Sequence, residues 1–141
     1  MIDDRTAPYA ALILRLSLGT MLLAHGLLLK VLTFGLAGTA GYFQSIGFPG
    51  AFAYLVILGE IGGGIALILG LWTRVIALLL LPILIGATLQ HVGNGWLFTA
   101  KGGGWEYPAF WTVTLVVQAL LGDGAFSLRP TLLAQRPALA H

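Results

Sequence analysis

The sequence of 141 residues is 58% hydrophobic and only 9% charged, and its mean hydropathy is +0.95. This composition excludes a soluble globular domain and a disordered chain, the lack of cysteine excludes disulfides and thiolate metal sites, and seven dispersed Lys and Arg give no nucleic-acid-binding surface. The lipid bilayer is therefore the expected surrounding, with room for a single all-α domain over residues 1–141 that contains about four transmembrane helices.

The first expected span covers about residues 9–32 and carries three charged or titratable side chains, Arg15, His25 and Lys30. At about 100° per residue these three fall on one helix face, which is expected to point into the bundle. Lys30 lies nearest the end of the span. Its long side chain is expected to extend to the lipid headgroups, and a role in ligand binding is the alternative.

Residues 33–50 form the first connection, in which several glycines and the Pro49-Gly50 pair are expected to break helix continuity. The segment is too apolar for a free loop. We expect it to lie in the membrane interface, with one helical turn around Tyr42 to Ile46.

The second expected span, about residues 51–72, carries a single charge, Glu60. A carboxylate inside the bilayer has to face protein, water or a counter-charge, so Glu60 is either a site residue or a structural hydrogen-bonding group. Counting helical rise from the ends of the spans predicts that Glu60 meets the His25 face of the first helix. Gly59 and Gly63 have the spacing that allows close approach of another helix.

The third and fourth spans are expected at about residues 75–92 and 107–122, the fourth being short and marginal. Gly70 is expected to end the preceding helix and Thr73 to cap the next one. The remaining residues, 123–141, are expected to form a surface tail.

The connection between these two spans is the most polar part of the chain. His91 and Glu106 stand at its two ends, near the same face of the membrane. Each is costly at this depth alone, so we expect the two side chains to approach within hydrogen-bonding distance, directly or through one water.

Positive charge sets the expected orientation. Arg5, Arg74, Arg129 and Arg136 fall on one side of the bundle, and Lys30 and Lys101 on the other. The positive-inside rule therefore predicts that both termini are cytoplasmic. Arg15 is left in the inner half of the bundle, with Gln118 as its expected partner by depth.

Several short motifs share the order and spacing of a known family. They are Arg15 with Gly19, His25-Gly26 and Lys30; Phe48-Pro49-Gly50; Glu60-Ile61-Gly62-Gly63-Gly64; Gly70 to Arg74; His91 with Asn94-Gly95; and Trp105-Glu106-Tyr107-Pro108. From Arg15 to Leu128 the chain resembles the DoxX family. The resemblance implies a four-helix, multi-pass protein of the bacterial inner membrane. The family's namesake is the small subunit of a thiosulfate:quinone oxidoreductase, and some relatives partner redox enzymes.

These observations favour a membrane subunit of a quinone-linked or redox-defence oxidoreductase system, with a polar site in the outer half of the bundle. Quinone is the expected cofactor, no metal is expected, and the unequal depths of the two histidines argue against haem. Each histidine is alternatively an interior hydrogen-bonded residue. The expected catalytic residues are Glu60, His25, His91 and Glu106, and the expected cofactor-binding residues are Gln90, Asn94, Trp105 and Lys30.

Two other classes of function stay open. A small proton-coupled transporter or channel would use Glu60 and His25 as a relay. A non-catalytic membrane anchor would use the glycine-rich faces to bind redox enzyme subunits, or a second copy of the chain.

Overall fold

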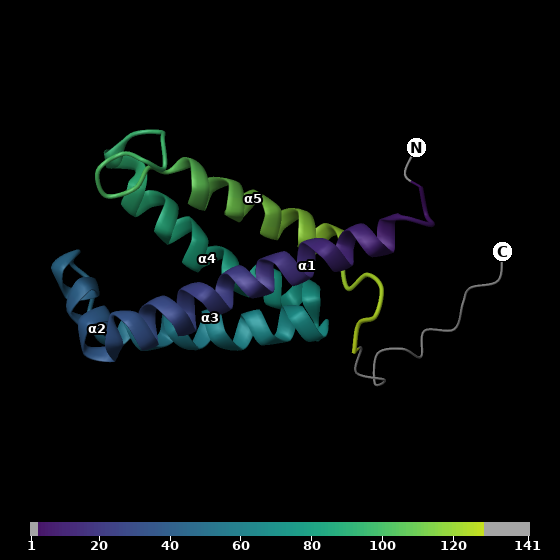
Figure 1. The fold of residues 1–141 in the computed structure, drawn as a ribbon, viewed down its shortest axis with the longest axis horizontal. Helices are drawn as coiled ribbons and strands as arrows, with labels where there is room; N and C mark the ends of the chain where they lie inside the picture. The colour runs from purple at the N-terminus through teal and green to yellow at the C-terminus, as the bar shows by residue number, and fades with distance from the viewer. Residues whose placement is uncertain (1–2, 129–141) are drawn as a thin grey trace.

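The computed structural model describes residues 3–128, and in this part of the chain it contains only helices and turns (Figure 1). The expected all-α class is confirmed for these residues. Most of the expected tail, with Arg129 and Arg136, lies outside the described residues.

The first helix is longer than the predicted span and changes type along its length. Helix α1, Ala7–Leu23, begins with Pro8 in its first turn and continues without a break into the π-helix η1, Ala24–Thr33. The π-helical pattern extends to the backbone of Phe34, whose N–H donates to the carbonyl of Leu29, five residues earlier, at 2.8 Å.

The first connection contains a helix, α2 (Gly35–Ser45), where the sequence predicted a single turn. Gly35 turns the chain with a φ of +73°, as expected for a glycine that breaks a helix, and Gly47 does the same after α2 with a φ of +90°. Gly38 and Gly41, in contrast, lie inside α2. A glycine inside a helix costs about 1 kcal/mol relative to alanine. Packing of α2 against η1 and α3 offsets that cost.

Helices α3, Ala51–Leu69, and α4, Thr73–His91, form a tight hairpin. Gly70 ends α3 in the left-handed conformation, as predicted. Thr73 is not the cap of α4, because Trp72 with a φ of 43° occupies that position. Thr73 is the first helical residue, and its N–H donates to Asp123 Oδ1 at 3.2 Å.

One 3-10 turn, η2 (Val92–Asn94), extends α4, and α5 covers Glu106–Leu121. Within residues 3–128 three helices are long and apolar enough to cross a membrane: Ala7–Thr33, Ala51–Leu69 and Thr73–Asn94. With 16 residues α5 is shorter than these three.

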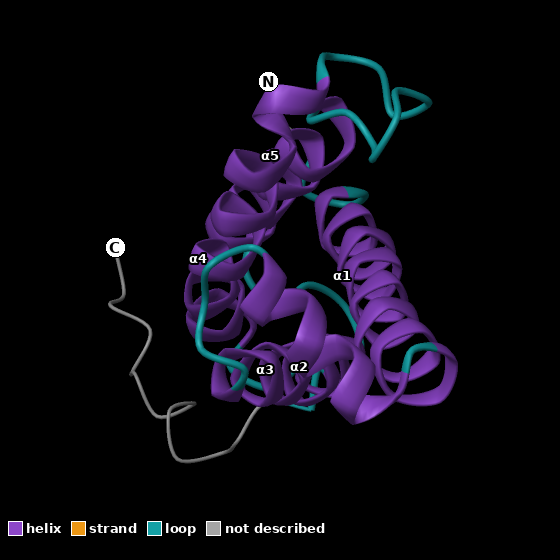
Figure 2. Cartoon of the chain, turned by 90° about the vertical axis from the view of Figure 1, so that its left-hand side faces the viewer, coloured by secondary structure: helices purple, strands orange, loops and turns teal. Residues whose placement is uncertain are grey.

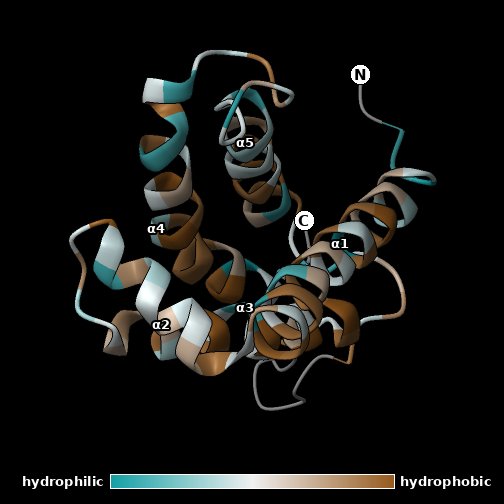
Figure 3. Ribbon diagram, turned by 60° about the vertical axis from the view of Figure 1, so that its left-hand side comes forward, coloured by the Kyte–Doolittle hydropathy of each residue, from teal (hydrophilic) through white to brown (hydrophobic). Residues whose placement is uncertain are grey.

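The helices associate in two pairs, α1 beside α3 and α4 beside α5, which diverge towards the end that carries α2 (Figures 1 and 2). Hydrophilic segments lie mainly at helix ends and in connections (Figure 3). The described chain ends and the α3–α4 turn meet at one end, where the N–H of Ala125 donates to Pro8 and that of Leu128 to Leu69. The core cluster comprises Leu18, Leu22, Leu67, Ala77, Leu80, Leu84, Trp111, Leu115 and Ala119.

Arg15 is buried at this same end, with 1% of its surface exposed, but it does not pair with Gln118 as predicted. Its Nη2 donates to the carbonyl of Ala125 at 3.0 Å, whereas Gln118 donates to the carbonyl of Gly122. The guanidinium passes so close to Gly70 that a Cβ there would overlap it. Arg15 thus reaches the segment after α5, which sequence position alone did not show.

Candidate functional site

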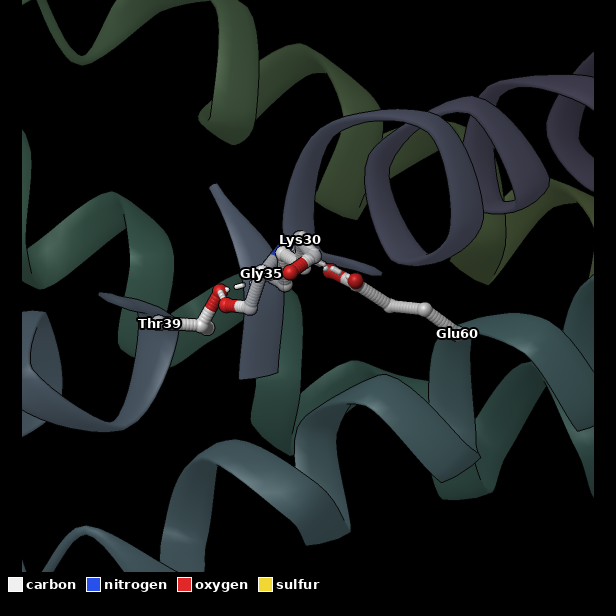
Figure 4. A network of polar contacts seen from close by, with 4 residues as sticks. All are labelled: Lys30, Gly35, Thr39 and Glu60. Atoms are coloured by element: carbon white, nitrogen blue, oxygen red, sulfur yellow. Dashed lines mark hydrogen bonds and ion pairs between the residues drawn. The ribbon is translucent and has the colours of Figure 1, made fainter. Parts of the chain in front are cut away.

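Glu60 and Lys30 form a partly buried ion pair between α3 and η1 (Figure 4). Lys30 Nζ lies 2.8 Å from both carboxylate oxygens of Glu60. The side chain of Glu60 is 6% exposed and that of Lys30 is 21% exposed. The expectation that Glu60 faces inward is correct, whereas the predicted extension of Lys30 to the headgroups is wrong.

The backbone geometry explains why Lys30 becomes the partner of Glu60. In a π-helix residues five apart are hydrogen-bonded neighbours, so His25 and Lys30 lie on the same side of η1. Gly26 allows α3 to approach closely, because a Cβ at Gly26 would lie 2.9 Å from Cβ of Glu60. Glu60 therefore meets the His25 face of the first helix, as the sequence predicted. The residue on that face that pairs with its carboxylate is Lys30.

A cavity of about 950 Å³ lies beside this ion pair, bounded by η1, α2, α3 and α4. This volume is near the upper end of the range typical of small-molecule sites, about 300–1,000 Å³. The lining is mainly apolar. Five of the eight predicted site residues line the cavity: His25, Lys30, Glu60, Gln90 and His91.

An aromatic wall covers the side of the cavity formed by α2 and the start of α3. Its ring centroids follow one another at 6.1 Å from Tyr42 to Phe43, 6.4 Å from Phe43 to Phe48, and 5.8 Å from Phe48 to Phe52. All four rings line the cavity. The sequence predicted only that this connection lies in the membrane interface, and it did not show that these aromatic residues line the cavity.

His25 contacts α5 as well as the cavity. Its ring meets the indole of Trp111 edge-on, with centroids 4.9 Å apart, and Nδ1 is buried without a hydrogen-bond partner among residues 3–128. The indole nitrogen of Trp111 is likewise buried without a hydrogen-bond partner among these residues. Trp111 was not a predicted site residue, because nothing in its sequence neighbourhood distinguishes it from a core aromatic side chain.

The other three predicted site residues belong to the connection before α5 and do not line the cavity. Asn94 Nδ2 donates to the carbonyls of Gly102 and Gly103 at 3.1 and 2.9 Å. Trp105 packs against Trp96 with ring centroids 4.5 Å apart. These contacts hold the connection in shape.

The direct hydrogen bond predicted between His91 and Glu106 is absent from the described structure. His91 Nδ1 lies 2.7 Å from the carbonyl of Ala87, and Glu106 Oε1 accepts from the N–H of Phe98 at 2.9 Å. Because a carbonyl only accepts, Nδ1 of His91 carries a proton in this arrangement. Local backbone groups satisfy each side chain, a solution that spacing along the sequence does not show.

Comparisons with known proteins agree with the motifs. Residues 10–100 match the DoxX family. The chain is 37% identical over 127 residues to "Putative oxidoreductase CatD" of Bacillus subtilis strain 168, covering 90% of each protein. It is 34% identical over 104 residues to "Inner membrane protein YqjF" of Escherichia coli K12, covering 67% of this chain and 72% of that protein. No solved structure matches the chain.

Proposed function

The chain belongs to the DoxX family of membrane proteins, and from this premise we propose that it is a membrane subunit of a quinone-linked or redox-defence oxidoreductase system. The name of the relative CatD supports the redox assignment. The observation that carries the proposal is the cavity, which combines a large apolar volume with the Lys30–Glu60 pair, Gln90 and His91 on its wall.

These features suit a quinone because its ring and isoprenoid chain are apolar and its two carbonyl oxygens accept hydrogen bonds. Lys30 is more exposed than Glu60, so the ammonium is the part of the pair available to a ligand oxygen. The aromatic wall, Tyr42 with Phe43, Phe48 and Phe52, offers faces for the ring.

Reduction of a quinone to a quinol consumes two electrons and two protons. In this proposal a partner redox enzyme supplies the electrons, and the polar wall of the cavity holds the carbonyl oxygens where they are protonated. His91 and Glu60 are the proton-exchanging groups on that wall. Glu106, Asn94 and Trp105 then support the connection and do not contact the ligand.

We place the protein in the bacterial inner membrane as a multi-pass protein with four spans and cytoplasmic termini. The relative named as an inner membrane protein supports this location. Helix α5 packs along α4, and at 16 residues it spans about 24 Å, which short interfacial extensions bring close to the bilayer core of about 30 Å.

The test is binding of a short-chain quinone, decylubiquinone, to the purified protein, followed by quenching of tryptophan fluorescence. We expect saturable quenching, with a Kd at least about tenfold higher in Lys30→Met because a charge-assisted hydrogen bond is lost. Lys101→Met is the matched control, because Lys101 is exposed in the connection before α5 and does not line the cavity.

Quenching that does not saturate, or that both lysine variants weaken equally, would contradict the quinone site. Proton flux into liposomes that contain only this protein would favour the transporter function instead. Stoichiometric copurification with a redox enzyme, without quinone binding, would favour the anchor.

A further inference from the structure

We infer that Thr39 is a positioning residue, which fixes Lys30 against Glu60 and thereby couples helix α2 to the polar end of the cavity. The functional importance of Thr39 rests on the proposed function, in which Lys30 contacts the ligand in the cavity. Thr39 itself belongs to none of the motifs that the sequence interpretation used.

The contact is a hydrogen bond between two helices. Thr39 is 4% exposed, and its hydroxyl lies 2.8 Å from the carbonyl oxygen of Lys30 and 2.9 Å from that of Gly35 (Figure 4). Bonding to Gly35, four residues earlier, is ordinary for threonine in a helix. Bonding to Lys30 is not, because it joins α2 to η1.

The carbonyl of Lys30 needs this partner because Lys30 lies in the last turn of η1, which ends at Thr33. A continuing π-helix would supply the N–H of Gly35, five residues later, but Gly35 turns the chain at a φ of +73°. Carbonyls in the last turn of a helix lack intrahelical donors. Within residues 3–128 the Thr39 hydroxyl is the donor from outside η1 that reaches this oxygen.

Fixing this backbone position also limits the region that the Lys30 ammonium can reach. Lys30 is the residue whose ammonium contacts both oxygens of Glu60, and α2 contributes Tyr42 and Phe43 to the aromatic wall. Movement of α2 on ligand binding would therefore displace the backbone of Lys30, whose ammonium forms the ion pair with Glu60. Thr39 links the shape of the cavity to the position of its cation.

The chemical reactivity of Lys30 tests the inference without any ligand. Lys30 and Lys101 are the two lysines of the sequence, so in a Lys101→Arg background Lys30 is the single lysine. We expect Thr39→Val to raise its rate of acylation by a membrane-permeant succinimidyl ester about fivefold, the equilibrium shift that corresponds to loss of one hydrogen bond. Thr39→Ser, which keeps the hydroxyl, should restore the original rate.

Ser45→Ala is the matched control, because it removes another hydroxyl-to-carbonyl bond within α2, Ser45 to Tyr42 at 2.7 Å, away from Lys30. Its acylation rate should equal that of the parent. If Thr39→Val does not fold, Thr39→Ala tests the same bond. An unchanged Lys30 rate in folded Thr39→Val or Thr39→Ala, or an equal rise in Ser45→Ala, would overturn the assignment.

The Kd for decylubiquinone separates this inference from the proposed function. If the parent protein binds the quinone, folded Thr39→Val should bind it more weakly and Thr39→Ser as well as the parent does. If the parent does not bind it while the Lys30 rates follow the expected pattern, the proposed function fails and the positioning role of Thr39 stands.

Discussion

At the residue scale the Lys30–Glu60 pair is the main feature, because each charge lowers the cost of placing the other inside the bundle. Removing one partner leaves an uncompensated charge, whereas replacing both with apolar side chains of similar volume is often nearly neutral for stability. We therefore expect Lys30→Met and Glu60→Leu each to lower the apparent melting temperature in detergent, and the double variant to recover most of the loss.

Glu60→Gln completes this set, because it keeps an acceptor for Lys30 and removes the charge. It should retain the fold and impair the quinone-dependent activity of the assembled system. If the two single losses simply add in the double variant, the residues are not coupled, and the ion pair does not explain their burial.

The same pair shows how far residue-level prediction reached. The need for a partner for Glu60, and the helix face that provides it, followed from the cost of a charge in the bilayer. The identity of that partner, Lys30, did not follow from this cost. Depth was counted as if the first helix ended at the headgroups, whereas α2 packs against η1 and covers the end of that helix, so that Lys30 is enclosed.

At the scale of elements, the glycines of α3 differ in what they face. The sequence singled out Gly59 and Gly63, but a Cβ at either would meet only flexible side-chain ends of α4. The close backbone approach is made by Gly64, where a Cβ would lie 2.9 Å from the carbonyl oxygen of Gly19 in α1. Gly62 faces open space within the described structure.

This difference predicts opposite effects of one substitution within one helix. Gly64→Ala should lower the apparent melting temperature, because overpacking costs about 1–3 kcal/mol and the new Cβ would meet backbone atoms of α1 instead of a flexible side-chain end. Gly62→Ala should leave it unchanged or raise it, because alanine favours the helix by about 1 kcal/mol. Size-exclusion chromatography after heating measures the apparent melting temperature of each variant. An equal decrease for Gly64→Ala and Gly62→Ala would refute the packing described for α1 and α3.

Helix α2 is the element that the sequence did not predict. Gly35, Gly38 and Gly41 all indicated breaks, and only Gly35 makes one. Local propensity was overridden by packing against η1 and α3, which is a property of the folded bundle. For the same reason the aromatic wall of the cavity could not be anticipated, since it depends on where α2 lies.

At the scale of the whole molecule, the apolar runs were enough to place the four long helical segments, 7–33, 51–69, 73–91 and 106–121, within a few residues. Helix α3 ends at Leu69 and α5 at Leu121, each directly before a glycine, and Gly70 was predicted to end α3. Five of eight predicted site residues meet at one cavity because polar residues in a membrane bundle share its interior. The other three lie in a connection whose shape depends on its own hydrogen bonds, such as Asn94 to Gly103.

The architecture also carries a prediction about orientation, because the described chain ends and the α3–α4 turn lie at one end and α2 lies at the other. Arg74 is exposed at the start of α4, Lys101 is exposed in the connection that follows α4 and η2, and the sequence has no cysteine. In intact cells an impermeant maleimide should label Lys101→Cys and spare Arg74→Cys, since arginine-rich ends stay in the cytoplasm. Membrane permeabilisation should then label both, which shows that Arg74→Cys is reactive. Labelling of Arg74→Cys alone in intact cells would show that the orientation is the reverse of the predicted one, with the cavity near the cytoplasmic face. Labelling of both variants in intact cells would place both positions on the outer side, so α4 would not cross the membrane.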